Sequence, residues 1–129
     1  MTEVTGQMEV RSFDSPDEVR EFAGHGHADA VTLANGKTAL RGHYEPGWQW
    51  SKDVRPIAGT ELCQVSHLGF CVAGQMDVTM PSGGDSQVVH MRAGDLARIP
   101  PGHDAWVVGE ETCVFIDLGD VGSYAQSKT

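Results

Sequence analysis

Short runs of alternating apolar and polar residues, separated by glycine and proline, make up most of the chain. Between Val31 and Leu40, apolar positions alternate on either side of Asn35-Gly36, a pair that accepts the positive φ angles of a tight two-residue turn. This segment predicts a β-hairpin. Turn residues then recur at short intervals, at positions 46–47, 56–59, 74, 81–84, 94 and 100–102. Short strands between regular turns are typical of an antiparallel sandwich or barrel.

A different pattern precedes the hairpin. Ser15-Pro16-Asp17-Glu18 combines a capping serine, a proline suited to a first helical turn and two acids that favour the positive end of a helix dipole. It predicts a short helix over residues 16–23, ended by the glycines of Gly24-His25-Gly26. The expected organisation is an N-terminal extension with this helix, a barrel and a disordered tail, over residues 1–28, 29–122 and 123–129.

Length and charge narrow the class of protein. The 129 residues suffice for one domain with a single core. The net charge of −9, from 18 acidic against 9 basic side chains, repels nucleic acid, so we expect no nucleic-acid partner. No run approaches the roughly 20 apolar residues of a membrane helix, and the first residues do not resemble a secretory signal; we expect a cytoplasmic protein with no membrane partner. The three cysteines form no C-x-x-C pair and are expected to be reduced.

Several turn segments carry a family resemblance. Gly94 to Gly102, GDLARIPPG, resembles the second sequence motif of the cupin superfamily, G-x5-P-x-G-x2-H-x3-N. Glu45-Pro46-Gly47 and Val72-Ala73-Gly74 resemble the two ends of the first motif, G-x5-H-x-H-x3–4-E-x6-G. The resemblance implies an all-β, cupin-type double-stranded β-helix, or jelly-roll barrel, with a pocket at its mouth. In that family three histidines and a glutamate usually hold a divalent metal ion, such as Zn, Fe, Mn, Ni or Cu.

The metal-binding positions of the first motif carry other residues in this chain. Counting from the leading glycine puts Asp53 and Arg55 at the paired-histidine positions, and counting back from the final glycine puts His67 at the glutamate position. We prefer this register because it keeps both glycines. A second register counts a short spacer back from His67 and puts Glu61 and Cys63 at the paired-histidine positions.

The second motif also departs from the family, because Ala105 occupies the fourth ligand position and His103 lies two residues earlier. Strand alternation places His67 and His103 on the barrel interior in either register. Two imidazoles at one mouth are good ligands for Zn²⁺ or Fe²⁺, with Asp53 or Cys63 as a third ligand. The alternative is a pair of metal-free pocket histidines, with Cys63 packed as a small apolar residue.

Arg55 shares a face with Asp53 in the preferred register. The two side chains form either an ion pair with each other or a site in which Arg55 grips the carboxylate of a small organic acid. On the second interpretation, Arg55, His67 and His103 are the residues that bind a small-molecule ligand.

Four other histidines lie outside these motifs. His25 and His27 spell the H-x-H of the first motif, but they precede the hairpin and are expected to lie in a solvated loop. His43 and His90 fall within strand patterns, and the sequence indicates a partner for neither.

Three tryptophans bear on oligomerisation. If the candidate ligands face inward, strand parity turns Trp48, Trp50 and Trp106 outward, where large apolar rings need cover from the N-terminal hairpin or a second subunit. Because the family resemblance also implies dimers, we predict a homodimer. The alternative is a bulge that reverses the alternation, so that the tryptophans line an aromatic pocket.

Two hypotheses for the activity remain open. The first is a small cupin that binds a small organic molecule, such as an anion, in the barrel mouth, with or without a divalent metal. The second is a metal-dependent enzyme of dioxygenase or isomerase type that acts on a small organic acid. The departures at all four ligand positions favour the first, and the sequence alone does not decide whether the chain is an enzyme.

Overall fold

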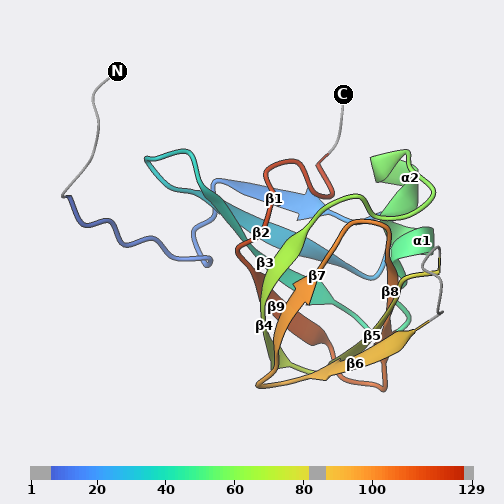
Figure 1. Ribbon diagram of the computed structural model, residues 1–129. Helices are drawn as coiled ribbons and strands as arrows, with labels where there is room; N and C mark the ends of the chain where they lie inside the picture. Colours follow the sequence, from blue (N-terminus) through green and yellow to red (C-terminus); the bar gives the residue numbers. More distant parts are fainter. Residues whose placement is uncertain (1–6, 82–86, 127–129) are drawn as a thin grey trace.

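The computed structural model describes residues 7–81 and 87–126, which form nine strands and two short helices (Figure 1). The strands are β1 (Glu18–Glu21), β2 (Gly26–Thr32), β3 (Thr38–Tyr44), β4 (His67–Ala73), β5 (Gln75–Thr79), β6 (Val88–Arg92), β7 (Leu96–Ile99), β8 (Asp104–Val108) and β9 (Cys113–Asp117). The helices are α1 (Trp50–Asp53) and α2 (Arg55–Ala58). Within the described residues, no helix is long and apolar enough to cross a membrane.

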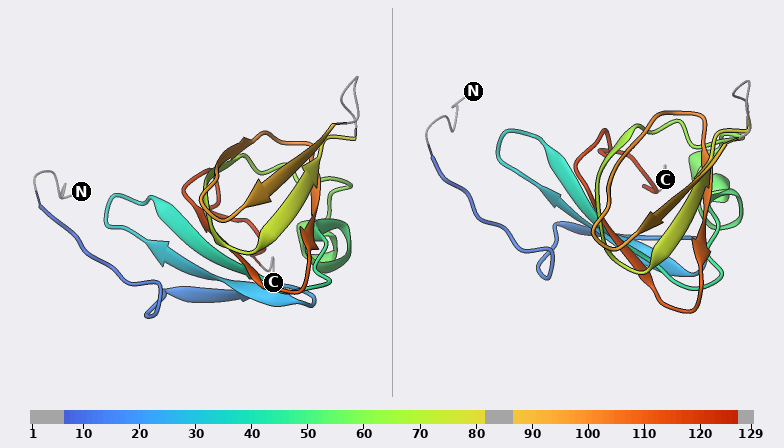
Figure 2. Two further views of the ribbon diagram at one scale, coloured as in Figure 1. Left: turned by 90° about the horizontal axis from the view of Figure 1, so that it is seen from below. Right: turned by 60° about the horizontal axis from the view of Figure 1, so that its bottom comes forward.

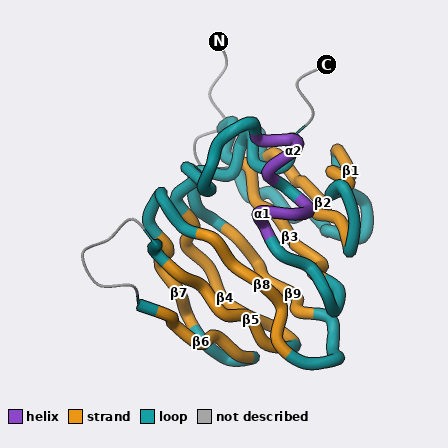
Figure 3. Tube along the Cα trace, turned by 90° about the vertical axis from the view of Figure 1, so that its right-hand side faces the viewer, coloured by secondary structure: helices purple, strands orange, loops and turns teal. Residues whose placement is uncertain are grey.

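Two antiparallel sheets face each other and enclose the interior (Figure 2). The larger sheet has the strand order β1-β2-β3-β9-β4-β7, and the smaller has the order β6-β5-β8. The β2–β3 hairpin extends the larger sheet beyond the barrel (Figure 2), whereas α1 and α2 lie at one end of it (Figure 3). This is the all-β barrel of two facing sheets that the sequence predicts.

Strands β4 and β9 form the wall behind the candidate site. They alternate strictly, and their buried residues are His67, Gly69 and Cys71 in β4 and Cys113, Phe115 and Asp117 in β9. Gly69 allows the two backbones to approach closely, because a Cβ at this position would collide with the carbonyl oxygen of Ile116.

The hairpin predicted around Asn35-Gly36 is present, but its loop is one residue longer than a two-residue turn. The Leu33 N–H donates to the Lys37 carbonyl at 2.8 Å, which leaves residues 34–36 as the loop. Gly36 has a φ of 90°, and this positive angle is the one that glycine accepts without strain. The extra residue shifts every pairing of β2 with β3 by one position.

The short helix predicted over residues 16–23 is wrong, because β1 occupies this segment and pairs with β2. The Asp17 carboxylate does not serve a helix terminus; it accepts hydrogen bonds from the Thr32 N–H at 2.8 Å and from Arg11 at 2.7 Å. The ladder with β2 satisfies the backbone of this segment and outweighs its local capping signal. The boundary predicted at residue 28 falls inside β2.

The outward orientation predicted for the tryptophans is wrong for two of the three. Trp48 and Trp50 are 2% and 1% exposed and line the barrel interior. Strand parity does not apply to them, because the chain turns at Gly47 and α1 begins at Trp50. Trp106 in β8 is half-buried, and its side chain lies on the opposite face of the strand from the buried Ala105. The two buried tryptophans therefore give no argument for a second subunit.

The segment that follows β9 is held next to β1 by a buried arginine. The Arg20 guanidinium donates to the carbonyl oxygens of Val121, Gly122 and Tyr124 at 2.8, 2.7 and 3.0 Å. Tyr124 and Ala125, which the sequence places in a disordered tail, are consequently buried, and residues 127–129 lie outside the described part of the chain.

Candidate metal centre

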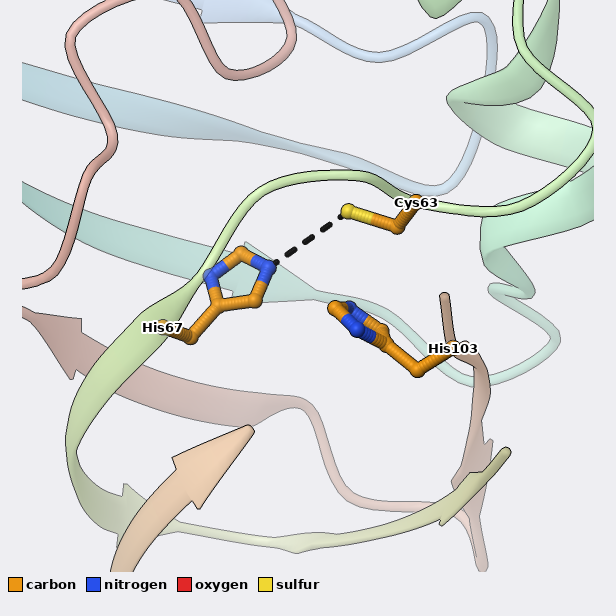
Figure 4. Close-up of side chains that lie close together, drawn as sticks. All are labelled: Cys63, His67 and His103. Atoms are coloured by element: carbon orange, nitrogen blue, oxygen red, sulfur yellow. Dashed lines mark hydrogen bonds between the residues drawn. The ribbon is translucent and has the colours of Figure 1, made fainter. Parts of the chain in front are cut away.

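Three potential metal ligands converge inside the barrel (Figure 4). The Cys63 Sγ and one ring nitrogen each of His67 and His103 lie within 4.8 Å of one another, and all three side chains are buried. His67 begins β4, His103 directly precedes β8, and Cys63 lies in the loop between α2 and β4. That loop is tied to the β8 side by the Cys63 N–H, which donates to the His103 carbonyl at 2.9 Å, and by the Gly102 N–H, which donates to the Cys63 carbonyl at 2.7 Å.

Both imidazoles are oriented by their Nδ1 atoms. His67 Nδ1 bonds Asp117 Oδ2 at 2.5 Å, and His103 Nδ1 bonds the Pro100 carbonyl at 2.7 Å. These bonds leave the Nε2 of each ring for another partner, and the Nε2 of His67 bonds the Cys63 Sγ at 3.6 Å. Metal-binding histidines are held in the same way, with the second nitrogen donating to a carboxylate or a backbone carbonyl.

Cys63 and His67 form a charged pair. Burial raises the pKa of the Cys63 thiol, but hydrogen bonds from His103 and His67 and the charges of both rings outweigh it and lower this pKa to about 6. Burial lowers the pKa of His67, but Asp117 and Cys63 outweigh it and raise this pKa to about 9. The thiolate, which is the form that binds a metal, is therefore the stable form of Cys63 at neutral pH.

The space around these ligands is small. A cavity of about 30 Å³, bordered by His67, His103, Trp50 and Tyr124, lies in the interior, enough for a water molecule or two. A pocket of about 430 Å³ is lined by Cys63 and shares Trp50 and Tyr124 with the inner cavity. A larger molecule would therefore meet the site from the Cys63 side.

The other residues that the sequence proposed lie apart from this cluster. Asp53, at the end of α1, accepts a hydrogen bond from the Gln49 N–H at 3.0 Å and faces His25 Nδ1 at 3.2 Å, so its partner is not Arg55. Arg55 begins α2, and its buried Nε has no hydrogen-bond acceptor within the described residues.

Of the two registers, the second matches the positions of the side chains better. It puts Cys63 at a ligand position, whereas the preferred register puts Asp53 and Arg55 on helices α1 and α2. Glu61, its other candidate, is exposed.

Two contacts of His67 were missed from the sequence. Asp117 orients the ring, and Tyr124 packs edge-on against it with ring centroids 5.1 Å apart. Asp117 could have been found, because it shares the inward-facing side of an apolar strand with Cys113 and Phe115. A carboxylate buried on that side needs a hydrogen-bond or charged partner. Tyr124 had no such signal.

The donor set of this cluster fits a borderline divalent ion. Two imidazole nitrogens and one thiolate suit Zn²⁺ or Fe²⁺ and are a poor match for Mg²⁺ or Ca²⁺. A metal ion held by these three side chains would keep at least one coordination position for another ligand, as in catalytic zinc sites.

The likeness to solved structures decides the fold. Oxalate decarboxylase from Bacillus subtilis, in a two-residue deletion mutant, matches 95% of this chain with a TM-score of 0.64 and 24% identity, over 33% of its own length. A formate complex of the Lactobacillus farciminis oxalate decarboxylase matches 80% of this chain over 30% of its own length, with a TM-score of 0.59 and 18% identity. An uncharacterised Klebsiella pneumoniae protein with a double-stranded β-helix domain matches 96% of this chain over 93% of its own length, with a TM-score of 0.58 and 20% identity.

This chain has the cupin-type fold. It spans about a third of the two oxalate decarboxylases and nearly the whole of the Klebsiella protein. No protein-family model matches the sequence, and no curated protein matches it either. At these identities the likeness establishes the cupin barrel alone, and the chemistry rests on the residues inside it.

Proposed function

We propose that this cupin binds one divalent metal ion, Zn²⁺ or Fe²⁺, through Cys63, His67 and His103, and presents it to a small anionic ligand. The observation that carries the proposal is the orientation of both histidines. Each Nδ1 bonds a fixed acceptor, which leaves both Nε2 atoms as the candidate ligands, and one ligand atom from each of the three residues lies within 4.8 Å of the others. Preorganised ligands of this kind bind metal without first paying for rearrangement.

The proposed ligand is limited by the space next to the ion. The inner cavity of about 30 Å³ admits water or a diatomic molecule, and a carboxylate must approach from the pocket of about 430 Å³ beside Cys63. The formate in the Lactobacillus farciminis oxalate decarboxylase complex is an anion of suitable size. We propose formate-like carboxylates as the ligand class, with the ion rather than Arg55 as their main anchor.

Metal content tests the proposal directly. The protein purified without chelator is expected to contain close to one equivalent of zinc or iron, and His67→Ala and Cys63→Ser are expected to lose it. Co²⁺ loaded into the metal-free protein is expected to give a thiolate-to-cobalt charge-transfer band that disappears in Cys63→Ser. Cys71→Ala is the matched control, because Cys71 is buried beside Cys113 and away from the cluster. A band that persists in Cys63→Ser would contradict the proposal.

A second candidate is a metal-dependent enzyme that acts on a small organic acid. The open coordination position favours it, since a closed fourth ligand would leave no place for a substrate. Oxalate is the first probe, because two of the similar structures are oxalate decarboxylases. Carbon dioxide released from oxalate by the metal-loaded protein, and lost in His103→Gln, would support the enzyme. Binding without release would support the ligand-binding role.

We propose a different surface for the interface of the predicted homodimer. Apolar side chains on the outer face of β4 and β7 remain exposed, with Phe70 at 43% and Leu96 at 77%. These two residues are directly paired across the strands, so their side chains share one face at an edge of the larger sheet. We propose that a second copy covers this face. Light scattering is expected to give a dimer for the native chain and a monomer for Leu96→Lys; a native monomer would contradict it. A cytoplasmic location stays a prediction.

A further inference from the structure

A second group of metal-binding side chains lies on the outer face of the larger sheet. His27 and Asp29 lie two residues apart in β2, and His43 lies directly opposite His27 in β3. The His27 Nε2 is 3.4 Å from Asp29 Oδ1, the His43 Nε2 is 2.8 Å from Asp29 Oδ2, and one ligand atom from each residue falls within 4.8 Å of the others. The two imidazoles stack with centroids 4.5 Å apart.

The group is separate from the interior cluster. Successive residues of a strand point to opposite faces, so His43 lies on the outside of the wall and Tyr44 lies inside, where it borders the inner cavity. No residue is shared between the two groups.

The strand ladder fixes the positions of the ligand atoms. Cross-strand partners and next-but-one neighbours in paired strands lie on one face at fixed distances, so β2 and β3 hold all three side chains without a flexible loop. Asp29 is buried at 5% exposure, while the imidazoles of His27 and His43 are 35% and 25% exposed. A buried carboxylate under two accessible imidazoles leaves outward coordination positions to water.

We propose that His27, Asp29 and His43 form a second site for a borderline divalent ion, of which Zn²⁺ is the probe. The two Nε2 atoms and one carboxylate oxygen would be the ligands, because two imidazoles and a carboxylate suit such ions. The separations of 2.8 and 3.4 Å bracket the spacing of ligands around a zinc ion, whose bonds are about 2.0–2.1 Å long. In the metal-free protein, the His43 Nε2–H donates to Asp29 Oδ2 at 2.8 Å, while the His27 Nε2 lies 3.4 Å from Asp29 Oδ1.

Arg41 limits the strength of the site. Its guanidinium lies 2.9 Å from Asp29 Oδ2 and places a positive charge beside the proposed ion. The same guanidinium also bonds Asp14 at 2.9 Å and lies over the Phe13 ring, so it has other partners when Asp29 turns to a metal. Within the described residues, neither His27 nor His43 has a hydrogen bond at Nδ1 that would orient the ring for a metal. Zn²⁺ therefore binds here more weakly than at Cys63, His67 and His103.

Zinc titration of the full, chelator-treated chain tests the site. Isothermal titration calorimetry of the native protein is expected to show a tight and a weaker event. His27→Gln and His43→Gln are each expected to weaken the second event by at least about tenfold and to keep the first. His90→Gln is the matched control, because His90 also faces a strand carboxylate, Asp77, at 2.6 Å but has no third ligand in the described residues. Both events are expected to persist in it.

The two proposals can fail separately. Loss of the thiolate-to-cobalt band in Cys63→Ser, with the weaker zinc event unchanged, is expected if both are right. A weaker event that is as strong in His27→Gln and His43→Gln as in His90→Gln overturns the outer site alone. Zinc binding that depends on His43 but not on Cys63 overturns the interior site and supports the outer one. If His43→Gln does not fold, His27→Gln gives the decision, since its side chain is the more exposed.

Discussion

His67 and Asp117 are joined by a hydrogen bond of 2.5 Å between Nδ1 and Oδ2, from the first residue of β4 to the last residue of β9. The second carboxylate oxygen accepts from the Gly119 N–H at 3.1 Å and, more weakly, from the Leu68 N–H at 3.4 Å. The carboxylate is thus held at both oxygens. It sets both the orientation of the His67 ring and the nitrogen that carries the proton.

Asp117→Asn is expected to weaken metal binding at the interior cluster by roughly 10- to 100-fold. The amide keeps the size of the side chain but removes the charge that favours an Nδ1–H tautomer. Competition with a chromophoric chelator measures the affinity. Asp77→Asn is the control, because it removes the carboxylate that faces a surface histidine, His90. Equal affinities in the two variants would contradict the role given to Asp117.

The Cys63–His67 pair predicts a window of pH in the metal-free protein. The pKa of His67 is raised to about 9, so its contribution to folding stability is complete below its unfolded pKa of about 6.5 and is lost as the pH rises through about 9. The pKa of Cys63 is lowered to about 6, so its contribution is present at high pH and is lost as the pH falls through about 6. The charged pair exists between these two values.

Denaturant unfolding at several pH values measures this effect. The free energy of unfolding of the native chain is expected to exceed that of Cys63→Ser by roughly 1.5–3 kcal/mol. This difference is expected to be largest between about pH 6 and 9. The absorbance of the thiolate gives a second readout, with a midpoint near pH 6 that is absent from Cys63→Ser. Cys71 and Cys113 should not titrate there, because burial raises the pKa of both. A stability difference independent of pH would exclude the charged pair.

Arg20→Met is expected to lower the free energy of unfolding by about 2 kcal/mol or more. The change leaves the carbonyl oxygens of Val121, Gly122 and Tyr124 without their donor and frees the segment that places Tyr124 against His67. Chemical denaturation measures the loss. Arg98→Met is the control, because Arg98 is exposed in β7. Similar stabilities for the two variants would mean that the segment is held by other contacts.

Gly69→Ala is expected to destabilise the barrel by more than about 3 kcal/mol or to prevent folding. A methyl group there meets the Ile116 backbone, which cannot move without separating β4 from β9. Gly122→Ala is the control, since a Cβ at Gly122 has nothing within 4 Å, and it should change stability by less than about 0.5 kcal/mol. Thermal unfolding compares the two. A stable Gly69→Ala protein would show that the strands can separate without loss of the fold.

The barrel was predictable because its signals are local. Glycine and proline mark the turns whatever the rest of the chain does, and alternation then assigns the faces of the strands. His67 and His103 follow from this alternation, and both face the same cavity in the structure. The helix predicted at Ser15-Pro16 failed because a local cap competes with pairing to β2, which only the folded chain supplies.

The third candidate ligand of the interior cluster was harder to choose from the sequence, because Cys63 lies outside the strands. The choice between Asp53 and Cys63 depends on the path of the segment between β3 and β4, where two short helices replace an extended strand. Counting residues along a motif assumes the constant rise per residue of an extended strand. That assumption fails where the chain forms helices.

The outer histidine pair was missed for two reasons. The solvated loop predicted at His27 is wrong, because this residue lies in β2, and the predicted register of the β2–β3 hairpin differs from the observed one by one residue. A two-residue turn at Asn35-Gly36 would put His27 opposite Tyr44, whereas the observed three-residue loop puts it opposite His43. The predicted turn residues were right and the register was not. A surface cluster that depends on register cannot be inferred from the turn sequence alone.

Neighbouring residues of strand β3 face opposite sides of the sheet: His43, stacked on His27, lies on the outer face, and Tyr44 lines the inner cavity. Inserting or deleting a single residue between Thr38 and His43 would exchange the two sides, exposing the tyrosine and burying the imidazole. Point substitutions can therefore change either face independently, but a change in strand length alters both at once. In this strand, a gain or loss of one residue is a far greater disturbance than replacement of a side chain.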